Sequence, residues 1–281
     1  RDTDRSRGLG DVYKRQPVVS SFYDLPSLDR ALKGVNTLLI STFNLFTDCR
    51  CGYLNLLHEA VAEGVKRIIF ISSAGRGDSV SLPMQENRET EVHIQQCGIP
   101  YAVFRVNILM ENLPFFIGTE QGTGIYYPAG NGRVGFVSVH DVAEAILPFV
   151  TGRFGVENRA YTLSHEITYS FDDIAAKLSQ YYSGRVKYES VDLAFYRKTL
   201  LQMDIPDDTV DRLCSVAKAI SLNCYDLSDY TLKRLLGRHA EQEQLRQRIR
   251  RWFSQKESGP FLFGSQLTML SDYLHGMYRH L

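Results

Sequence analysis

The sequence predicts an α/β protein built on a doubly wound parallel sheet, with a smaller and mostly helical C-terminal part. Two observations carry this prediction. Short runs rich in β-branched and aromatic residues alternate with segments of helical periodicity, as expected of βαβ units. Three of these runs, 37–43, 66–73 and 99–106, are almost continuously apolar, which is typical of parallel strands that are buried on both faces.

The N-terminal half is expected to alternate strands and helices regularly. The predicted strands are 18–23, 37–43, 66–73 and 99–106, and the predicted helices between them are 28–35, 54–65 and 86–97. The last of these helices is highly charged, and the stretch from Glu86 to Glu91 is typical of a solvated helix face with opposite-charge pairs. Gly98 then ends the helix, because glycine tolerates the positive φ that a helix C-terminus often needs.

The C-terminal half is less regular and more helical. The predicted elements are strand 134–139, helix 142–149 with Asp141 as its N-cap, strand 161–163, a helix from Ser170 to Ser179 and strand 186–191. From Leu193 to Gly237 the pattern is helical. Residues 239–255 form a highly charged helical pattern, and 256–281 show no clear period.

Composition excludes several classes of function. Lysine plus arginine equals aspartate plus glutamate at 32 each, so no charge excess favours binding to nucleic acid or to an anionic membrane surface. No apolar run approaches the ~20 residues of a membrane span. The five cysteines are odd in number, and only Cys49 and Cys51 are close in sequence, which argues against a disulfide framework and a four-ligand zinc site. We therefore expect a reducing, cytoplasmic setting.

The first sixteen residues, Arg1 to Gln16, differ from the rest of the chain. They hold five basic and three acidic residues and almost no apolar side chains. The string SRGLGDVYKRQ reads as the in-frame translation of a sequencing adaptor, so 1–16 is expected to be non-native and a native segment with the first βαβα units to be missing before Pro17. We then expect the 281-residue chain to bind no dinucleotide and to be inactive; sequencing of the genomic locus tests this.

The remaining chain is expected to divide into three parts. Residues 17–150 would form the partial parallel-sheet domain, 151–238 a C-terminal substrate subdomain, and 239–281 a charged helix and tail of unknown role. The sequence leaves self-association as a homodimer open.

Candidate binding residues follow the predicted strands. Parallel doubly wound sheets bind ligands outside the carboxyl ends of their strands. The residues at those ends are Ser41, Thr42 and Phe43, then Ser72, Ser73 and Ala74, then Arg105, Val106 and Asn107. Small and hydroxylated side chains at neighbouring ends leave room for a flat ligand and offer hydrogen-bond donors, although serine and glycine are also ordinary loop residues.

Other motifs are weaker. The string GNGRVG at 130–135 matches G-x-G-x-x-G, but a loop precedes it and a strand follows, so it is interpreted as a turn. His58 and Glu59 lack the partner of a zinc-binding helix, and His140 with Asp141 is better explained by helix capping than by a catalytic pair. No G-x-S-x-G elbow and no Tyr-x-x-x-Lys pair is present in the sequence.

Several long strings together carry a family resemblance. They are LPSL at 25–28, GVKRIIFISSAG at 64–75, GIPY at 98–101, MENL at 110–113, GRVGFVSVHDVAEA at 132–145 and SFDDIA at 170–175. With these strings the chain, from about Val18 to Gly237, resembles the NmrA-like atypical short-chain dehydrogenases, and within them the NAD(P)H:quinone oxidoreductase branch.

The resemblance implies a Rossmann-type domain that binds NADP(H) or NAD(H). It implies that Ser41, Thr42 and Phe43 line the dinucleotide, and that the segments 72–74 and 105–107 flank the nicotinamide. Two departures from the family pattern stand out. The glycine-rich loop is absent from this chain, and Asn87 stands where many relatives carry histidine or lysine.

The function implied by the resemblance is hydride transfer from nicotinamide to a quinone-like small-molecule acceptor. No residue stands out as a general acid, and solvent can protonate a hydroquinone. Candidates for the acceptor pocket are Asn87, Met110, Phe115, Tyr126 and Tyr127. The alternative is a regulatory protein that senses NAD(P) and binds it without turnover, and the sequence does not decide which dinucleotide is preferred.

Overall fold

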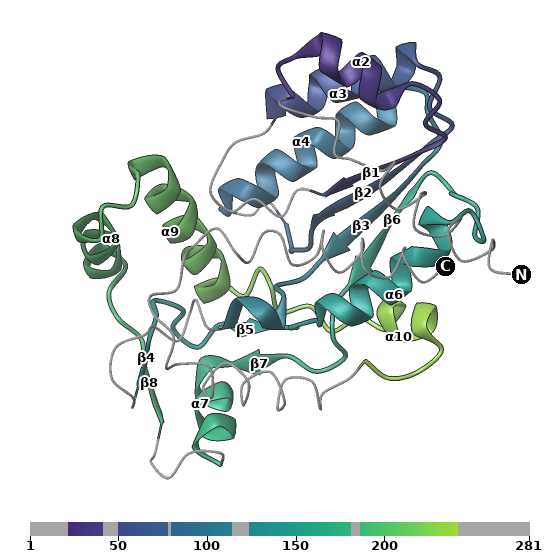
Figure 1. Ribbon diagram of the computed structural model, residues 1–281. Coiled ribbons are helices and arrows are strands. Elements are labelled where there is room, and N and C mark those ends of the chain that lie inside the picture. The colour runs from purple at the N-terminus through teal and green to yellow at the C-terminus, as the bar shows by residue number, and fades with distance from the viewer. Residues whose placement is uncertain (1–21, 42–49, 78–79, 114–123, 181–185, 241–281) are drawn as a thin grey trace, which may run out of the picture.

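The computed structural model describes residues 22–41, 50–77, 80–113, 124–180 and 186–240. Its centre is a four-stranded parallel sheet in the order β1-β2-β3-β6, as Figure 1 shows. The strands are β1 (Thr37–Ser41), β2 (Arg67–Ser73), β3 (Tyr101–Val106) and β6 (Arg159–Leu163). The fourth strand comes from after residue 150, and the predicted domain division at that residue stays a prediction.

Helices cover both faces of this sheet, which confirms the doubly wound α/β prediction. Helices α2 (Leu25–Leu32), α3 (Arg50–Ala62) and α4 (Leu82–Gln96) lie on one face, and α6 (Val139–Val150) and α10 (Thr231–Leu236) lie on the other (Figure 1). Successive side chains of β2 face the two helical layers alternately. Ile68 and Phe70 pack with the α2, α3 and α4 core, whereas Ile69 and Ile71 pack with α6.

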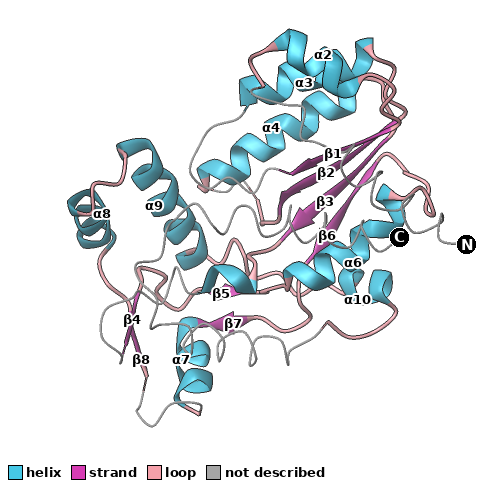
Figure 2. Cartoon of the chain, viewed as in Figure 1, coloured by secondary structure: helices cyan, strands magenta, loops and turns pink. Residues whose placement is uncertain are grey.

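A second core lies beyond the carboxyl ends of the central strands. Short strands form two small sheets: β4 (Gly124–Tyr126) pairs in parallel with β8 (Lys187–Glu189), and β5 (Arg133–Val134) pairs antiparallel with β7 (Tyr169–Ser170). Around them lie α7 (Phe171–Ser179), α8 (Leu193–Gln202) and α9 (Asp207–Ser221), and a short 3-10 turn, Met110–Asn112, follows β3. This part is mostly helical, and it draws on residues before 150 as well as after, so the predicted C-terminal substrate subdomain stays a prediction. Figure 2 shows it apart from the central sheet.

The two parts are joined chiefly through α4 and α9. The Arg212 guanidinium of α9 makes a bidentate ion pair with the Glu86 carboxylate of α4, and both side chains are largely buried. The backbone N–H of Leu82 also donates to Ser215 Oγ at 3.0 Å. Glu86 therefore does not belong to a solvated helix face, because its partner comes from a distant part of the chain.

Several local predictions are confirmed. The helix from Ser170 is capped by a reciprocal capping box, in which Ser170 Oγ accepts from the Asp173 N–H and the Asp173 carboxylate accepts from the Ser170 N–H. Gly98 follows α4 with φ of +80°. The string 130–135 is a turn that leads into a strand, so it holds no helix N-terminus for a phosphate.

Other local predictions are wrong. Of the predicted strand 134–139, only Val134 belongs to a strand, and Val137 makes an isolated bridge to Leu109. Helix α6 begins at Val139 and its N-cap is Ser138, whose Oγ accepts from the His140 N–H. Asp141 therefore lies inside α6 and is not its cap, and its carboxylate is buried against Arg238.

The first predicted strand and the predicted charged helix fall at the ends of the described ranges or beyond them. Residues 18–21 of the first predicted strand lie outside the described residues, and Phe22 and Tyr23 form a turn. The charged helix predicted at 239–255 lies almost wholly outside them. None of the helices that the structure describes is both long and apolar enough to cross a membrane.

Candidate functional site

The carboxyl ends of β1, β2 and β3 meet at one edge of the central sheet. Ser41, the last residue of β1, is exposed and pairs in register with Ile71 of β2. Ser73, the last residue of β2, is half-buried and pairs with Val106 of β3. Thr42 and Phe43 lie outside the described residues. The structure thus brings the predicted serines to one edge, although it does not describe the loop that follows β1.

A buried carboxylate stands beneath this edge. Glu91 of α4 is 2% exposed and accepts hydrogen bonds from Ser72 Oγ at 2.5 Å and from Arg105 Nη2 at 2.6 Å. Arg88 also pairs with the same carboxylate. Two guanidinium groups and a hydroxyl satisfy the buried charge. The side chains of Ser72 and Arg105 are therefore engaged in fastening α4 to β2 and β3.

Ser73 makes a different contact. Its Oγ accepts a hydrogen bond from Asn87 Nδ2 at 2.6 Å, and Asn87 is only 6% exposed. Asn87 stands one helical turn before Glu91 on α4, so both side chains point to the ends of the central strands. Asn87, one of the predicted pocket residues, is thus hydrogen-bonded to a residue at the end of a central strand.

Asn107 lies fully buried at the end of β3. Its Nδ2 donates to Ser164 Oγ at 2.9 Å and to the Tyr225 carbonyl at 3.0 Å, and its Oδ1 accepts from the Ile108 N–H at 2.8 Å. The two bonds from Nδ2 join the ends of β3 and β6 to the segment after α9. Val106 is buried in the sheet core, and Ala74 donates its N–H to the Val106 carbonyl at 2.8 Å.

The other predicted pocket residues do not gather in one place. Met110 and Tyr127 are buried in the second core, whereas Tyr126 is exposed and Phe115 lies outside the described residues. Burial raises the pKa of Tyr127 well above its usual value, with nearby Tyr196 adding to the effect. Tyr127 is therefore a protonated core residue, and its ring packs edge-on against Tyr196 at 5.4 Å.

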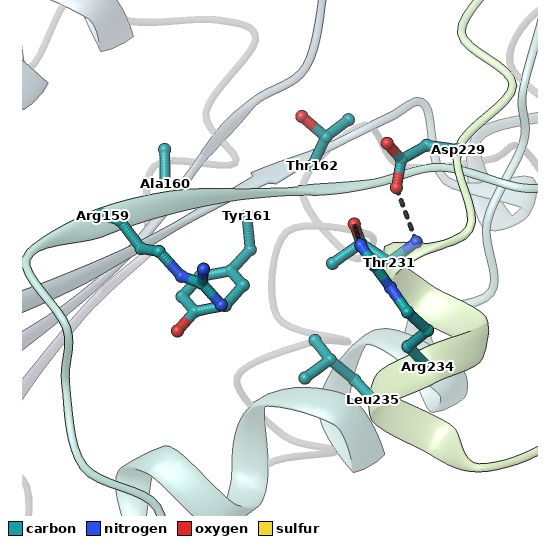
Figure 3. A pocket seen from close by; sticks show the side chains of 8 residues that line it. All are labelled: Arg159, Ala160, Tyr161, Thr162, Asp229, Thr231, Arg234 and Leu235. Carbon is teal, nitrogen blue, oxygen red and sulfur yellow. Dashed lines mark hydrogen bonds between the residues drawn. The ribbon is translucent and has the colours of Figure 1, made fainter.

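A cavity of about 540 Å³ lies elsewhere, between β6 and α10. Figure 3 shows its lining residues, which are Arg159, Ala160, Tyr161, Thr162, Asp229, Thr231, Arg234 and Leu235. The Arg159 guanidinium lies 4.5 Å from the centre of the Tyr161 ring, and Asp229 Oδ1 accepts from the Thr231 N–H at 2.6 Å. None of the predicted site residues lines this cavity.

One cluster has the residue types of a metal site. Ligand atoms of His140, Asp141 and Glu144 lie within 4.8 Å of one another on α6. Arg238 Nη2, however, donates to Asp141 Oδ1 at 2.8 Å and to Glu144 Oε2 at 2.5 Å. A guanidinium already neutralises both carboxylates, so the cluster is explained as an ion-pair network that fastens the segment after α10 to α6.

Comparison with known proteins places the chain in a family. Residues 16–230 match the model of the NmrA-like family. The chain belongs to the NmrA-like family. Among the curated relatives of this NmrA-like protein, an NAD(P)H azoreductase of Xenophilus azovorans is 27% identical over 191 residues, which cover 66% of this chain and 65% of the azoreductase. Quinone oxidoreductase 2 of Escherichia coli is 25% identical over 219 residues, which cover 78% of this chain and 76% of that protein.

Solved structures share the fold of this NmrA-like protein. An NADPH-dependent quinone oxidoreductase of Escherichia coli, complexed with NADPH, superposes with a TM-score of 0.74 at 24% identity, covering 84% of this chain and 83% of that chain. The negative transcriptional regulator NmrA in complex with NADP superposes with a TM-score of 0.63 at 17% identity, covering 84% and 79%. The chain spans about two thirds of the length of the curated azoreductase.

Glu91 and Tyr225 contribute to this edge but were not among the predicted residues. Glu91 had a sequence signal, since it stands four residues after Asn87 and so on the same helix face. Its burial depends on Arg105, which the chain supplies from another element. Tyr225 contributes a backbone carbonyl, which any residue could supply, so no sequence signal marks it.

Proposed function

We propose that this protein is an NAD(P)H-dependent oxidoreductase that transfers hydride from nicotinamide to a quinone or a similar small acceptor. The observation that carries the proposal is the membership of the NmrA-like family together with the exposed, hydroxyl-bearing carboxyl edge of the parallel sheet. The curated relatives named as an NAD(P)H azoreductase and a quinone oxidoreductase support the same class of reaction.

The small residues at the sheet edge leave room for the flat nicotinamide ring of a dinucleotide. Ser41 is exposed, Ser73 is half-buried with its oxygen held by Asn87, and the next residues, Ala74 and Gly75, have little or no side chain. We propose that Ser41, with Thr42 and Phe43 after it, lies along the dinucleotide and that Ser73 and Ala74 flank the nicotinamide. Ser72, Arg105, Val106 and Asn107 would support this edge from beneath, because their side chains are engaged in the protein or its core.

The reduced dinucleotide supplies the hydride, so the protein mainly binds and orients the two reactants. Hydride addition leaves negative charge on the acceptor, and a proton must then arrive. Tyr127 is not suited to donate it, since burial holds its pKa far above neutral pH. In the reaction that we propose, solvent protonates the hydroquinone anion and so completes the reduction.

A second candidate function is dinucleotide sensing without turnover. The observation that favours it is the structural similarity to the negative transcriptional regulator NmrA, which is complexed with NADP. In that case the protein would bind the dinucleotide and change its affinity for a partner, and no acceptor pocket would be needed.

One experiment separates the two functions. The full-length protein encoded at the genomic locus is titrated with NADPH and NADH by fluorescence, and NAD(P)H oxidation is then followed with a panel of quinones and an azo dye. We expect dinucleotide binding and acceptor-dependent oxidation. Tight binding with no oxidation by any acceptor would support the sensor, and no binding of either dinucleotide would contradict both functions.

A further inference from the structure

The two serines at the end of β2 are held in opposite ways. Ser72 is fully buried, and its hydroxyl donates its proton to Glu91. Ser73 is half-buried, and its oxygen accepts a proton from the amide of Asn87 at 2.6 Å. A hydroxyl carries one proton to donate. The proton of Ser72 is therefore committed inside the protein, whereas that of Ser73 has no acceptor among the described residues.

From this contrast we infer that Asn87 orients the Ser73 hydroxyl as a hydrogen-bond donor toward the carbonyl oxygen of the hydride acceptor. The inference rests on the proposed function and adds a donor and a positioning residue to it. Ser73 stands at the carboxyl end of β2, the edge at which this class of sheet binds ligands. Donation from Asn87 also polarises the hydroxyl and strengthens the bond that it donates in turn.

Asn87 is well placed to hold this orientation. It is almost fully buried on α4, one turn before Glu91, whose bonds to Ser72 and Arg105 fix the same face of the helix against two strands. The amide is neutral at every working pH and its Nδ2 can only donate. An aspartate at this position would, when ionised, accept the Ser73 proton and turn the hydroxyl away from the ligand.

The proposed step is balanced as follows. The C–H bond of the reduced nicotinamide breaks and its electron pair forms a new bond between hydrogen and the quinone, which is reduced while the dinucleotide is oxidised. Negative charge develops on the quinone oxygen that faces Ser73, and the hydrogen bond from Ser73 stabilises it. Water then protonates this oxygen, so Ser73 keeps its proton throughout.

The test uses variants of the full-length protein with saturating NAD(P)H and a quinone. We expect Ser73→Ala and Asn87→Ala each to lower kcat about tenfold to a hundredfold, less than the loss of a donor to a fully localised oxyanion, because the quinone ring delocalises the charge. Ser73→Thr keeps the hydroxyl and is expected to retain most of the activity. Ser221→Ala, at an exposed hydroxyl far from this edge in the sequence, is the matched control and should leave kcat unchanged.

Two readouts separate positioning from simple folding effects. The Kd of the dinucleotide should stay within about twofold of the original in all variants, and the Ser73→Ala/Asn87→Ala double variant should be no slower than Ser73→Ala, because Asn87 acts through Ser73. In Asn87→Asp, kcat should rise as pH falls through the pKa of the new carboxyl, since the protonated acid can again donate to Ser73. Asn87→Ala should show no such recovery.

The outcomes distinguish this inference from the proposed function. Quinone turnover that survives in Ser73→Ala would overturn the role of Ser73 alone. Multiplicative losses in the double variant, or an Asn87→Asp profile like that of Asn87→Ala, would overturn the positioning role of Asn87. Dinucleotide binding without any turnover by the original protein would refute the proposed oxidoreductase and this inference with it.

Discussion

Replacement of Arg212 by methionine tests the joint between the two parts of the molecule. Arg212 is 6% exposed and Glu86 is 15% exposed, so the substitution leaves a largely buried carboxylate without its bidentate partner. Breaking a buried ion pair from one side costs about 3–5 kcal/mol. Because some water still reaches Glu86, we expect the lower end, about 3 kcal/mol, which corresponds to a change of about 150-fold in the unfolding equilibrium constant.

Urea unfolding followed by circular dichroism measures this loss as a lower midpoint at unchanged slope. Arg197 provides the matched control, since it pairs with Asp211 of the same helix α9 while the two side chains are 41% and 54% exposed. Arg197→Met should lower the urea midpoint much less, because both side chains of this pair are in contact with water. The Glu86→Gln/Arg212→Met double variant should recover much of the stability, because no buried charge remains. An Arg212→Met loss no greater than that of Arg197→Met would refute the reasoning.

Three further predictions concern single residues. Burial lowers the pKa of His165, whose Nδ1 accepts the Ile167 N–H at 2.9 Å. The free energy of unfolding should therefore fall as the pH drops below about 6.5, because the unfolded chain binds the proton first. His165→Asn should flatten this part of the stability–pH curve, and an unchanged curve would contradict the prediction. Ser170→Ala removes the side-chain half of a capping box, the bond from the Asp173 N–H to Ser170 Oγ, and should cost about 1 kcal/mol in urea unfolding; no loss would argue against the cap. A Cβ at Gly135 would lie 2.6 Å from the Leu227 carbonyl oxygen, so Gly135→Ala should lower Tm, and an unchanged Tm would show that the segment can move aside.

The sequence predicts the central fold well because its signals are local. Continuous apolar runs identify β2 and β3, since a strand covered on both faces needs apolar residues throughout. The capping box at Ser170 marks the start of α7 within the helix itself. Where the prediction failed, the deciding partner is remote in sequence. Asp141 resembles a cap, but it is buried by its pair with Arg238.

The candidate site is predicted less completely for the same reason. Parallel topology was enough to bring Ser41 and Ser73 to one edge, since the carboxyl ends of parallel strands lie together. It does not say which side chains face a ligand. Arg105 turns into the protein because Glu91 is buried there. The spacing from Asn87 places Glu91 on the same helix face, but the alternating charges on α4 do not show that this face is buried.

The amide of Asn107 has a consequence for the order in which the chain can be completed during synthesis. It joins the end of β3 to Ser164, 57 positions later, and to Tyr225, 118 positions later. Since the entropy of closing a loop grows only with the logarithm of its length, the second closure costs only about 0.6 kcal/mol more than the first. The second closure is delayed mainly because Tyr225 is synthesised later, and only slightly by loop entropy. On the ribosome, β1, β2 and β3 can assemble early with their helices, while the amide at their carboxyl edge gains Ser164 and then its last partner, the Tyr225 carbonyl, only as those residues emerge. The edge proposed to bind the dinucleotide is therefore completed only late in synthesis, after residue 225 has emerged.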